Sequence, residues 1–346
     1  MNKKPFIHPY IPNSVPEVKK KMLAEIGVKD IEELYEDIPP ELRLKRDLNL
    51  PEPLLSELEL RRHMEAVLDR NISCAERSSF LGAGCARHYV PAICDEIAHR
   101  SEFLTAYAGE PYEDAGRFQV LFEYESLMAE LLDFDVVNVP TYDCRYDADL
   151  ACGDIQGLGN HMYYGGSLGG FIATRDEEKF VMEYPSRLFG IARTSVEGEW
   201  GFGDVAYSRT SFDKREKGKE FIGTAAALYG VAAAVYLALM GPQGMRELGI
   251  HILQKARYAV MKLAEVPGIR LRFHSTPFKE FVVDFNHAGK SVGEVNERLL
   301  EEGIFGGKDF SKEFPELAGC ALVAVTEMTT QVDIDKLAAV LKSYLG

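Results

Sequence analysis

The sequence of 346 residues lacks the cysteine pattern of a disulfide framework or a zinc site. Its six cysteines include no CxxC pair and do not group with histidines at the spacing of metal ligands. Scattered cysteines of this kind are typical of free thiols in a reducing compartment. The amino terminus, MNKKPFIHPYIP, is basic but has no apolar segment of the kind found in secretory signals. We therefore expect a cytoplasmic protein without a metal centre.

Basic charge and long apolar runs are also scarce. Lysine and arginine total 39 against 54 acidic residues, which gives a formal net charge of −15. Nucleic-acid-binding proteins carry basic patches, so this balance argues against a nucleic-acid partner. The longest apolar run, Ala225–Met240, is shorter than the ~20 residues that a membrane-spanning helix needs. Because Gly241-Pro242 ends this run, it reads as a buried core helix and gives no reason to expect a membrane partner.

The pattern along the chain predicts three parts. Residues 1–75 form a polar helical arm, interrupted by glycine and proline, with few residues able to make a core of their own. Residues 76–264 form a large α/β domain that contains a long amphipathic helix at Gly116–Phe134. Residues 265–346 read strand, strand, helix, strand, helix, which is typical of a small α+β domain. An arm without a core is expected to pack on another domain or subunit.

The stretch Asp147–Thr174 contains no lysine. It reads as a buried strand, a polar turn, a glycine-rich loop and a second strand, and His161 is its only basic residue. A lysine amine is the group that attaches carbonyl cofactors covalently. The loop glycines match neither GxGxxG nor GxxxxGK[ST], so a tight backbone path at a subunit contact is the more ordinary interpretation than a phosphate cradle. These glycines are Gly165, Gly166, Gly169 and Gly170.

Motifs spread over nearly the whole chain resemble one known family in the same order. Each is weak alone, but the combination is specific. They are ELRLKR at Glu41–Arg46, SFLGAGCARHYVP at Ser79–Pro91, SEFLTAY at Ser101–Tyr107, LFEYESLMAEL at Leu121–Leu131, TYD at Thr141–Asp143, REK at Arg215–Lys217 followed by Thr224, and the later AVYLALMGPQGMRELG and LLEEGIFGG. The set resembles subunit 1 of glycine dehydrogenase (decarboxylating), the P-protein of the glycine cleavage system.

The resemblance implies a fold, a cofactor and partners. The large domain is expected to have the fold-type I architecture of transferases that depend on pyridoxal phosphate. A homologous subunit 2 would carry the lysine and hold pyridoxal phosphate covalently, whereas Gly157 occupies the aligned position in this chain. The pair would decarboxylate glycine and pass the aminomethyl group to a lipoyl carrier protein, the H-protein. A homo- or hetero-oligomer is therefore expected.

Two departures from the family pattern stand out. Asp143 is followed almost at once by the strand that begins near Asp149, where the family has further strand–helix units. At ~30 residues per βαβ unit, roughly three units are missing, which shortens the large domain. The chain was shortened naturally or by construction, or a segment is omitted from it; the sequence leaves these alternatives open. The family's polar PYQPE-type loop also reads Ala108-Gly109-Glu110-Pro111-Tyr112 and has lost its glutamine.

Candidate functional residues come from the family-like loops and from arginines. His88 and Tyr89 are the catalytic candidates, because histidine transfers protons near neutral pH. A structural histidine in a loop is the alternative. Arginines can hold a carboxylate or phosphate with paired donors, although most are solvated or in surface ion pairs. The candidates for binding substrate or cofactor are Ser79, Thr105, Tyr107, Arg187, Arg215 and Thr224.

Two hypotheses about function remain open. The chain is a subunit of a glycine decarboxylase that works with a lysine-bearing partner, or it is a degenerate relative that acts as a non-catalytic interaction or regulatory subunit. The intact loops at Ser79–Pro91 and Ser101–Tyr107 favour the first. The missing segment after Asp143 favours the second.

Overall fold

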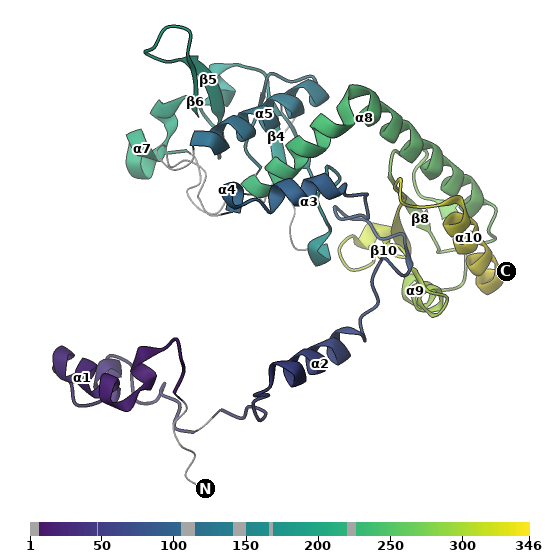
Figure 1. The fold of residues 1–346 in the computed structure, drawn as a ribbon. Helices are drawn as coiled ribbons and strands as arrows, with labels where there is room; N and C mark the ends of the chain where they lie inside the picture. Colours follow the sequence, from purple (N-terminus) through teal and green to yellow (C-terminus); the bar gives the residue numbers. More distant parts are fainter. Residues whose placement is uncertain (1–6, 47, 105–114, 141–149, 166–168, 220–225) are drawn as a thin grey trace. The chain divides into compact units, whose positions relative to one another are not determined.

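The computed structural model describes residues 7–46, 48–104, 115–140, 150–165, 169–219 and 226–346. Contacts divide the chain into two units, residues 1–71 and 72–346 (Figure 1). No described residue of the first unit is buried, so its helices depend on local signals at their ends. For example, the Ser56 hydroxyl accepts a hydrogen bond from Glu59 N–H at the start of α2. Its elements are η1 (Pro12–Ser14), α1 (Pro16–Ile26), η2 (Glu32–Tyr35) and α2 (Glu57–Leu68).

The first core of the second unit is built on a three-stranded antiparallel sheet. Its order is β2-β4-β3, with β2 at Val136–Val137, β3 at Ala151–Asp154 and β4 at Gly170–Thr174. All five residues of β4 are buried. Helices α5 (Ala115–Leu132) and α8 (Ala227–Ala264) supply the other side chains of this core. Its fully buried members are Tyr124, Met128, Val137, Ile155, Ala173 and Ala233.

A hairpin follows this sheet in the segment that the sequence marks only as polar. Strands β5 (Phe189–Arg193) and β6 (Trp200–Asp204) pair antiparallel. The Phe189 ring stacks on Phe118 of α5 with the ring centroids 4.9 Å apart, which anchors the hairpin on the core. The shorter helices of this region are α3 (Ala92–Ala98), α4 (Ser101–Leu104), η3 (Tyr163–Gly165), α6 (Glu178–Val181), η4 (Tyr207–Arg209), α7 (Ser211–Lys214) and η5 (Arg215–Lys217).

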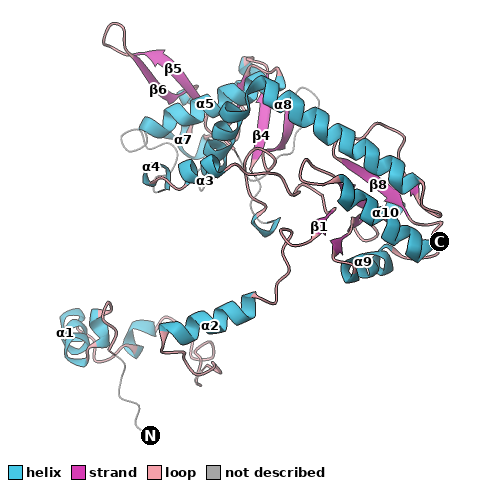
Figure 2. Ribbon diagram, turned by 45° about the vertical axis from the view of Figure 1, so that its right-hand side comes forward, coloured by secondary structure: helices cyan, strands magenta, loops and turns pink. Residues whose placement is uncertain are grey.

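The second core belongs to the carboxy-terminal α+β part, which follows the predicted element order. An antiparallel sheet of order β10-β11-β8-β7 is covered by two helices (Figure 2). Both helices begin with a capping box, at Ser291 with Glu294 and at Thr330 with Asp333. The elements are β7 (Arg270–Leu271), β8 (Glu280–Asp284), α9 (Val292–Glu301), β9 (Ile304–Phe305), β10 (Lys308–Asp309), η6 (Pro315–Leu317), β11 (Cys320–Ala324) and α10 (Gln331–Leu345).

Helix α8 contributes to both cores. It spans 38 residues, and Gly241 interrupts it with φ 60° and ψ 178°, next to Pro242. Residues before the break pack on the β4 sheet, whereas Ala256, Ala259 and Leu263 pack in the carboxy-terminal core. By length and composition alone, α8 is the one helix among the described residues that could cross a membrane. Its packing in two cores accounts for the same apolar composition.

The segment after the arm joins the two cores and carries the candidate loop. Strand β1 (Ser78–Ser79) pairs parallel with β9. Phe80 is fully buried, its N–H donates to Phe305 C=O, and its own C=O accepts from Ala324 N–H. Residues 81–91 therefore leave the carboxy-terminal sheet from a fixed point and run toward the loop between β3 and β4.

One buried carboxyl predicts a measurable pH dependence of stability. Glu125 of α5 is 6% exposed, and its Oε2 accepts a 3.0 Å hydrogen bond from Phe189 N–H. Burial raises the pKa of this carboxyl well above its usual value, and the charge of Asp204 adds to the rise. The unfolded chain therefore loses this proton at lower pH than the folded chain does. Stability should fall as the pH rises from about 4.5 toward the raised folded-state pKa.

Glu125→Gln should remove that part of the pH dependence. Each unit of difference between the two pKa values is worth about 1.4 kcal/mol of unfolding free energy. Denaturant unfolding from pH 5 to pH 8 measures it, with Glu130→Gln, an exposed glutamate of the same helix, as the control. Identical pH profiles for wild type and Glu125→Gln would contradict the expectation.

Candidate functional site

A cavity of about 800 Å³ lies where the Ser79–Pro91 loop faces the loop between β3 and β4. Three segments that are distant in sequence form its wall. They contribute Ile72–Ala75, Ser79, Leu81, Gly82, Cys85, Arg87 and His88, then Gln156 and Asn160–Gly165, and finally Lys308. Gly165 of the glycine-rich stretch and the candidate histidine therefore line the same cavity.

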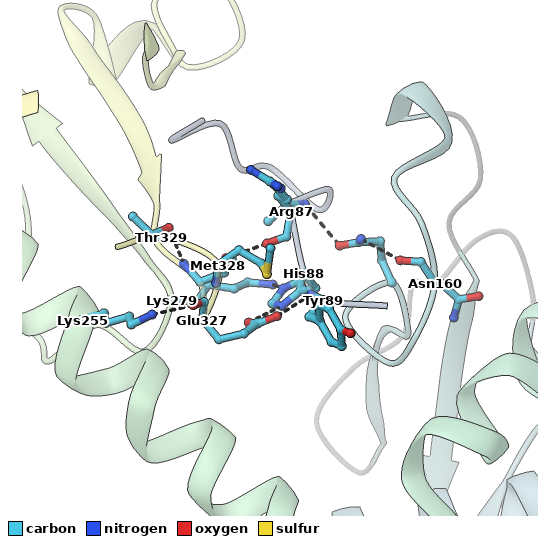
Figure 3. A network of polar contacts seen from close by, with 12 residues as sticks. Arg87, His88, Tyr89, Asn160, Lys255, Lys279, Glu327, Met328 and Thr329 are labelled. Carbon is cyan, nitrogen blue, oxygen red and sulfur yellow. Dashed lines mark hydrogen bonds and ion pairs between the residues drawn. The ribbon is translucent and has the colours of Figure 1, made fainter. Parts of the chain in front are cut away.

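His88 is held from the opposite side by Glu327, in the turn after β11 (Figure 3). The His88 Nδ1 atom lies 2.8 Å from Glu327 Oε2, and Tyr89 N–H donates to Glu327 Oε1 at 2.7 Å. The side chains of His88 and Glu327 are 5% and 15% exposed. With Glu327 ionised, Nδ1 carries the proton and Nε2 presents its lone pair. A carboxylate thus fixes both the orientation and the tautomer of the imidazole.

The charge state of Glu327 follows from these contacts. Burial alone would raise the pKa of the Glu327 carboxyl, but the hydrogen bonds from His88 and Tyr89 and the charge of His88 outweigh burial and lower that pKa. Two lysines approach the same group of residues. Lys255 Nζ donates to the Glu327 C=O at 2.5 Å, and Lys279 Nζ lies 3.4 Å from His88 Nε2. When the ring is neutral, Lys279 is thus the hydrogen-bond donor that faces His88 Nε2.

Gly157, which the sequence analysis aligned with the family lysine, lies against the same imidazole. A Cβ atom built on Gly157 would be 3.3 Å from His88 Nε2 and 3.4 Å from its Cδ2. A side chain at position 157 would therefore touch the ring of His88, which would have to move by a few tenths of an ångström. Because Gly157 offers no amine, the site does not fit covalent attachment of pyridoxal phosphate there.

Two buried amides shape the opposite wall, and the sequence analysis missed both. Gln156 is 1% exposed, and its Oε1 accepts from Ala86 N–H at 3.2 Å. Its Nε2 donates to the Asn160 C=O at 3.3 Å, and Asn160 Nδ2 donates to the Ile155 C=O at 3.1 Å. These bonds fix the β3–β4 loop against the Ser79–Pro91 loop. The signal in the sequence was weak, because both amides lie in the part that was read as a polar turn, where amides are ordinarily exposed.

The rim of the cavity carries two tyrosines in an unfavourable backbone conformation. Tyr163 and Tyr164 have φ values of 41° and 57°, in the left-handed region that non-glycine residues seldom adopt. The Tyr163 ring packs edge-on against His161, with the centroids 5.8 Å apart, and burial raises the pKa of its hydroxyl. Strain of this kind at the mouth of a cavity is common at binding sites.

The structure brings some predicted residues to this cavity and not others. Ser79 and His88 line it, and Tyr89 is 59% exposed beside it. Arg187 instead pairs with Asp204 at 2.5 Å and lies over the ring of Phe212. Arg215 is exposed in η5 and does not line the cavity. Thr105, Tyr107 and Thr224 lie outside the described residues. No group of three or more metal-ligating side chains occurs within the described ranges.

Comparison with known proteins decides the family. The sequence model of the glycine cleavage system P-protein matches residues 8–145 and 141–341. The chain belongs to this P-protein family. It is 31% identical to "Probable glycine dehydrogenase (decarboxylating) subunit 1" of Staphylothermus marinus, over 95% of this chain and 97% of that protein. The protein of the same name from Carboxydothermus hydrogenoformans is 30% identical, over 96% of this chain and 99% of that protein.

A solved structure of the same family confirms the predicted fold class. It is a crystal structure of glycine decarboxylase (P-protein) in inhibitor-bound form, with a TM-score of 0.78 and 25% identity over the whole of both chains. This P-protein chain thus has the fold-type I architecture of enzymes that depend on pyridoxal phosphate. The internal shortening is also confirmed, because the alignment with the Staphylothermus marinus protein spans 456 positions against the 346 residues here. The two family matches meet at residues 141–145, where the sequence analysis placed the missing units.

Proposed function

We propose that this chain is the non-lysine subunit of a glycine decarboxylase. The observation that carries the proposal is the absence of any lysine from residues 147–174, part of which lines the cavity beside His88. A homologous lysine-bearing subunit holds pyridoxal phosphate, which supplies the sink for the electrons left by loss of the carboxyl group. The aminomethyl group passes to the lipoyl carrier protein, and the complex works in the cytoplasm.

The residues of this chain have distinct roles in the proposal. His88 Nε2, oriented by Glu327, accepts or donates a proton in the cavity. Tyr89 is exposed beside it and meets the partner or the substrate. Ser79 contributes a hydroxyl to the wall. Arg187 and Arg215 lie away from the cavity. We therefore assign any binding by these two arginines to a surface shared with the partner subunit.

Reconstitution tests the assembly. The full-length chain and the homologous lysine-bearing subunit are purified separately and mixed, and light scattering measures the molar mass of the product. The proposal predicts a defined complex that contains both chains. Two chains that stay separate at micromolar concentration would overturn it.

Borohydride trapping tests which chain holds the cofactor. The purified chain is incubated with pyridoxal phosphate and reduced, and its peptides are mapped by mass spectrometry. We expect no adduct within residues 147–174, because Gly157 offers no amine and that stretch has no lysine. The lysine-bearing subunit is the positive control and should be labelled stoichiometrically. A stoichiometric adduct within 147–174 of this chain would contradict the assignment.

A non-catalytic role is the second candidate. It is favoured by the shortening, which leaves at least 110 of the 456 aligned positions without a counterpart here. A degenerate subunit would keep the contact with its partner and contribute nothing to turnover. Complex formation agrees with both roles, whereas decarboxylation by the complex separates them.

A further inference from the structure

Arg87 precedes His88 in the loop, but its side chain takes no part in the Glu327 network. Figure 3 shows the guanidinium extending away from Lys279 and Glu327. Arg87 is half-buried, and within the described residues its guanidinium has no hydrogen bond or ion pair. A guanidinium carries five N–H donors, and withdrawing them from water without an acceptor is costly. The side chain is therefore ready for a ligand that brings acceptor oxygens.

Arg87 lines a second, smaller cavity of about 190 Å³ that adjoins the first. Arg77, an exposed residue, also lines it, and its guanidinium has no hydrogen bond or ion pair in the part of the chain that the structure describes. The remaining wall comes from β1 and from the turn after β11. The two cavities share Ala75, Ser79, Leu81 and Arg87.

The acidic residues of the small cavity do not occupy these donors. Asp333 is engaged at the start of α10, where its Oδ1 accepts from the Ser78 hydroxyl at 2.5 Å and its Oδ2 accepts from Thr330 N–H at 2.9 Å. Burial alone would raise the pKa of the Asp333 carboxyl. These hydrogen bonds and the charge of Arg87 outweigh burial and lower that pKa, so the carboxylate stays ionised. Glu76 is exposed. The donors left open in the cavity are those of the two arginines.

We propose that this cavity binds a small carboxylate, anchored by Arg87. The planar guanidinium matches the two oxygens of a carboxylate with two parallel N–H···O bonds, which a lysine ammonium cannot reproduce. Arg77 adds a second positive charge at the same wall. The volume of about 190 Å³ limits the ligand to a small molecule. The site uses neither His88 nor position 157, so it does not depend on the proposed decarboxylation.

Calorimetric titration of the purified full-length chain tests the site directly. The probes are sodium acetate, glycine and inorganic phosphate at constant ionic strength. We expect saturable binding of the carboxylates. Arg87→Gln should weaken this binding about tenfold or more. Arg87→Lys should weaken it as well, because lysine keeps the positive charge but lacks the two parallel N–H donors of the guanidinium. Arg246→Gln, which removes an exposed arginine of α8 outside both cavities, should leave binding unchanged.

Thermal unfolding of the same variants separates binding from folding. Because the Arg87 guanidinium has no hydrogen bond or ion pair among the described residues and acts on Asp333 only through its charge, Arg87→Gln should melt close to wild type without ligand. Acetate should raise the melting temperature of wild type and not that of Arg87→Gln. Absence of saturable carboxylate binding, equal loss in Arg246→Gln, or phosphate binding that excludes carboxylates through Arg87 would each overturn the proposal.

Discussion

His88→Ala should lower glycine decarboxylation by the reconstituted complex about 10²–10⁴-fold, the usual contribution of a positioned general acid or base. The imidazole is fixed by Glu327 through Nδ1, and it presents Nε2 at the wall of the cavity. Removal of the ring takes away the proton-transfer group and leaves the rest of the loop rooted at Phe80. Turnover per folded complex, measured beside light scattering of the same preparation, gives the result.

The matched control is His251→Ala, which removes an exposed histidine of α8. A histidine that only fills space beside Gly157 would behave differently from a proton-transfer group. It would lower the thermal stability of His88→Ala and leave turnover per folded complex unchanged. That outcome would assign His88 to the structure of the loop and remove the catalytic role from Ser79–Pro91.

Glu327→Ala should destabilise the chain by about 1–3 kcal/mol, the usual cost of leaving a partly buried donor without its acceptor. Both carboxylate oxygens are used, one by His88 Nδ1 and one by Tyr89 N–H. The variant leaves the partly buried His88 Nδ1–H and the exposed Tyr89 N–H without their acceptor and releases the loop from the turn after β11. Denaturant unfolding at pH 7 measures the loss.

Two variants calibrate this result. Glu327→Gln keeps an acceptor for one of the two donors and should lose less stability than Glu327→Ala. Glu313→Ala removes an exposed carboxylate paired with Lys308 and should change stability far less than Glu327→Ala. The folded-state pKa of Glu327 is lowered, so its contribution is present above the unfolded pKa of about 4.5 and is lost as the pH falls below it. Equal stability of wild type and Glu327→Ala at pH 7 would contradict the account.

The carboxy-terminal part shows what the sequence could predict. Its central strands are short apolar runs, and its helices begin at residues that favour caps, so local pattern and packing agree. The predicted order strand, strand, helix, strand, helix therefore matches β7, β8, α9, β11 and α10, whereas the two-residue strands β9 and β10 were missed. The long helix at Gly116–Phe134 was predicted for the same reason. Strong periodicity needs no information from distant residues.

The parts that were missed depend on contacts between distant segments. Glu327 lies 239 residues from His88, and nothing near Thr326-Glu327-Met328-Thr329 marks it as a site residue. The β5–β6 hairpin was read as a polar segment, because glycines and charges dilute the alternation in Phe189–Arg193 and Trp200–Asp204. Arg187 was predicted to bind a ligand, but it forms a largely buried ion pair with Asp204 instead. Pairing partners of this kind appear only once the chain is folded.

Decarboxylation of glycine by the mixed subunits tests the central claim most directly. Release of labelled CO₂ from carboxyl-labelled glycine is measured while increasing amounts of this chain are added to a fixed amount of the lysine-bearing subunit, with pyridoxal phosphate and the lipoyl carrier protein present. The account predicts little release by either subunit alone and a rise that saturates when the two chains reach the stoichiometry of the complex. Release that is already complete with the lysine-bearing subunit alone, or that stays absent when the complex has formed, would contradict it.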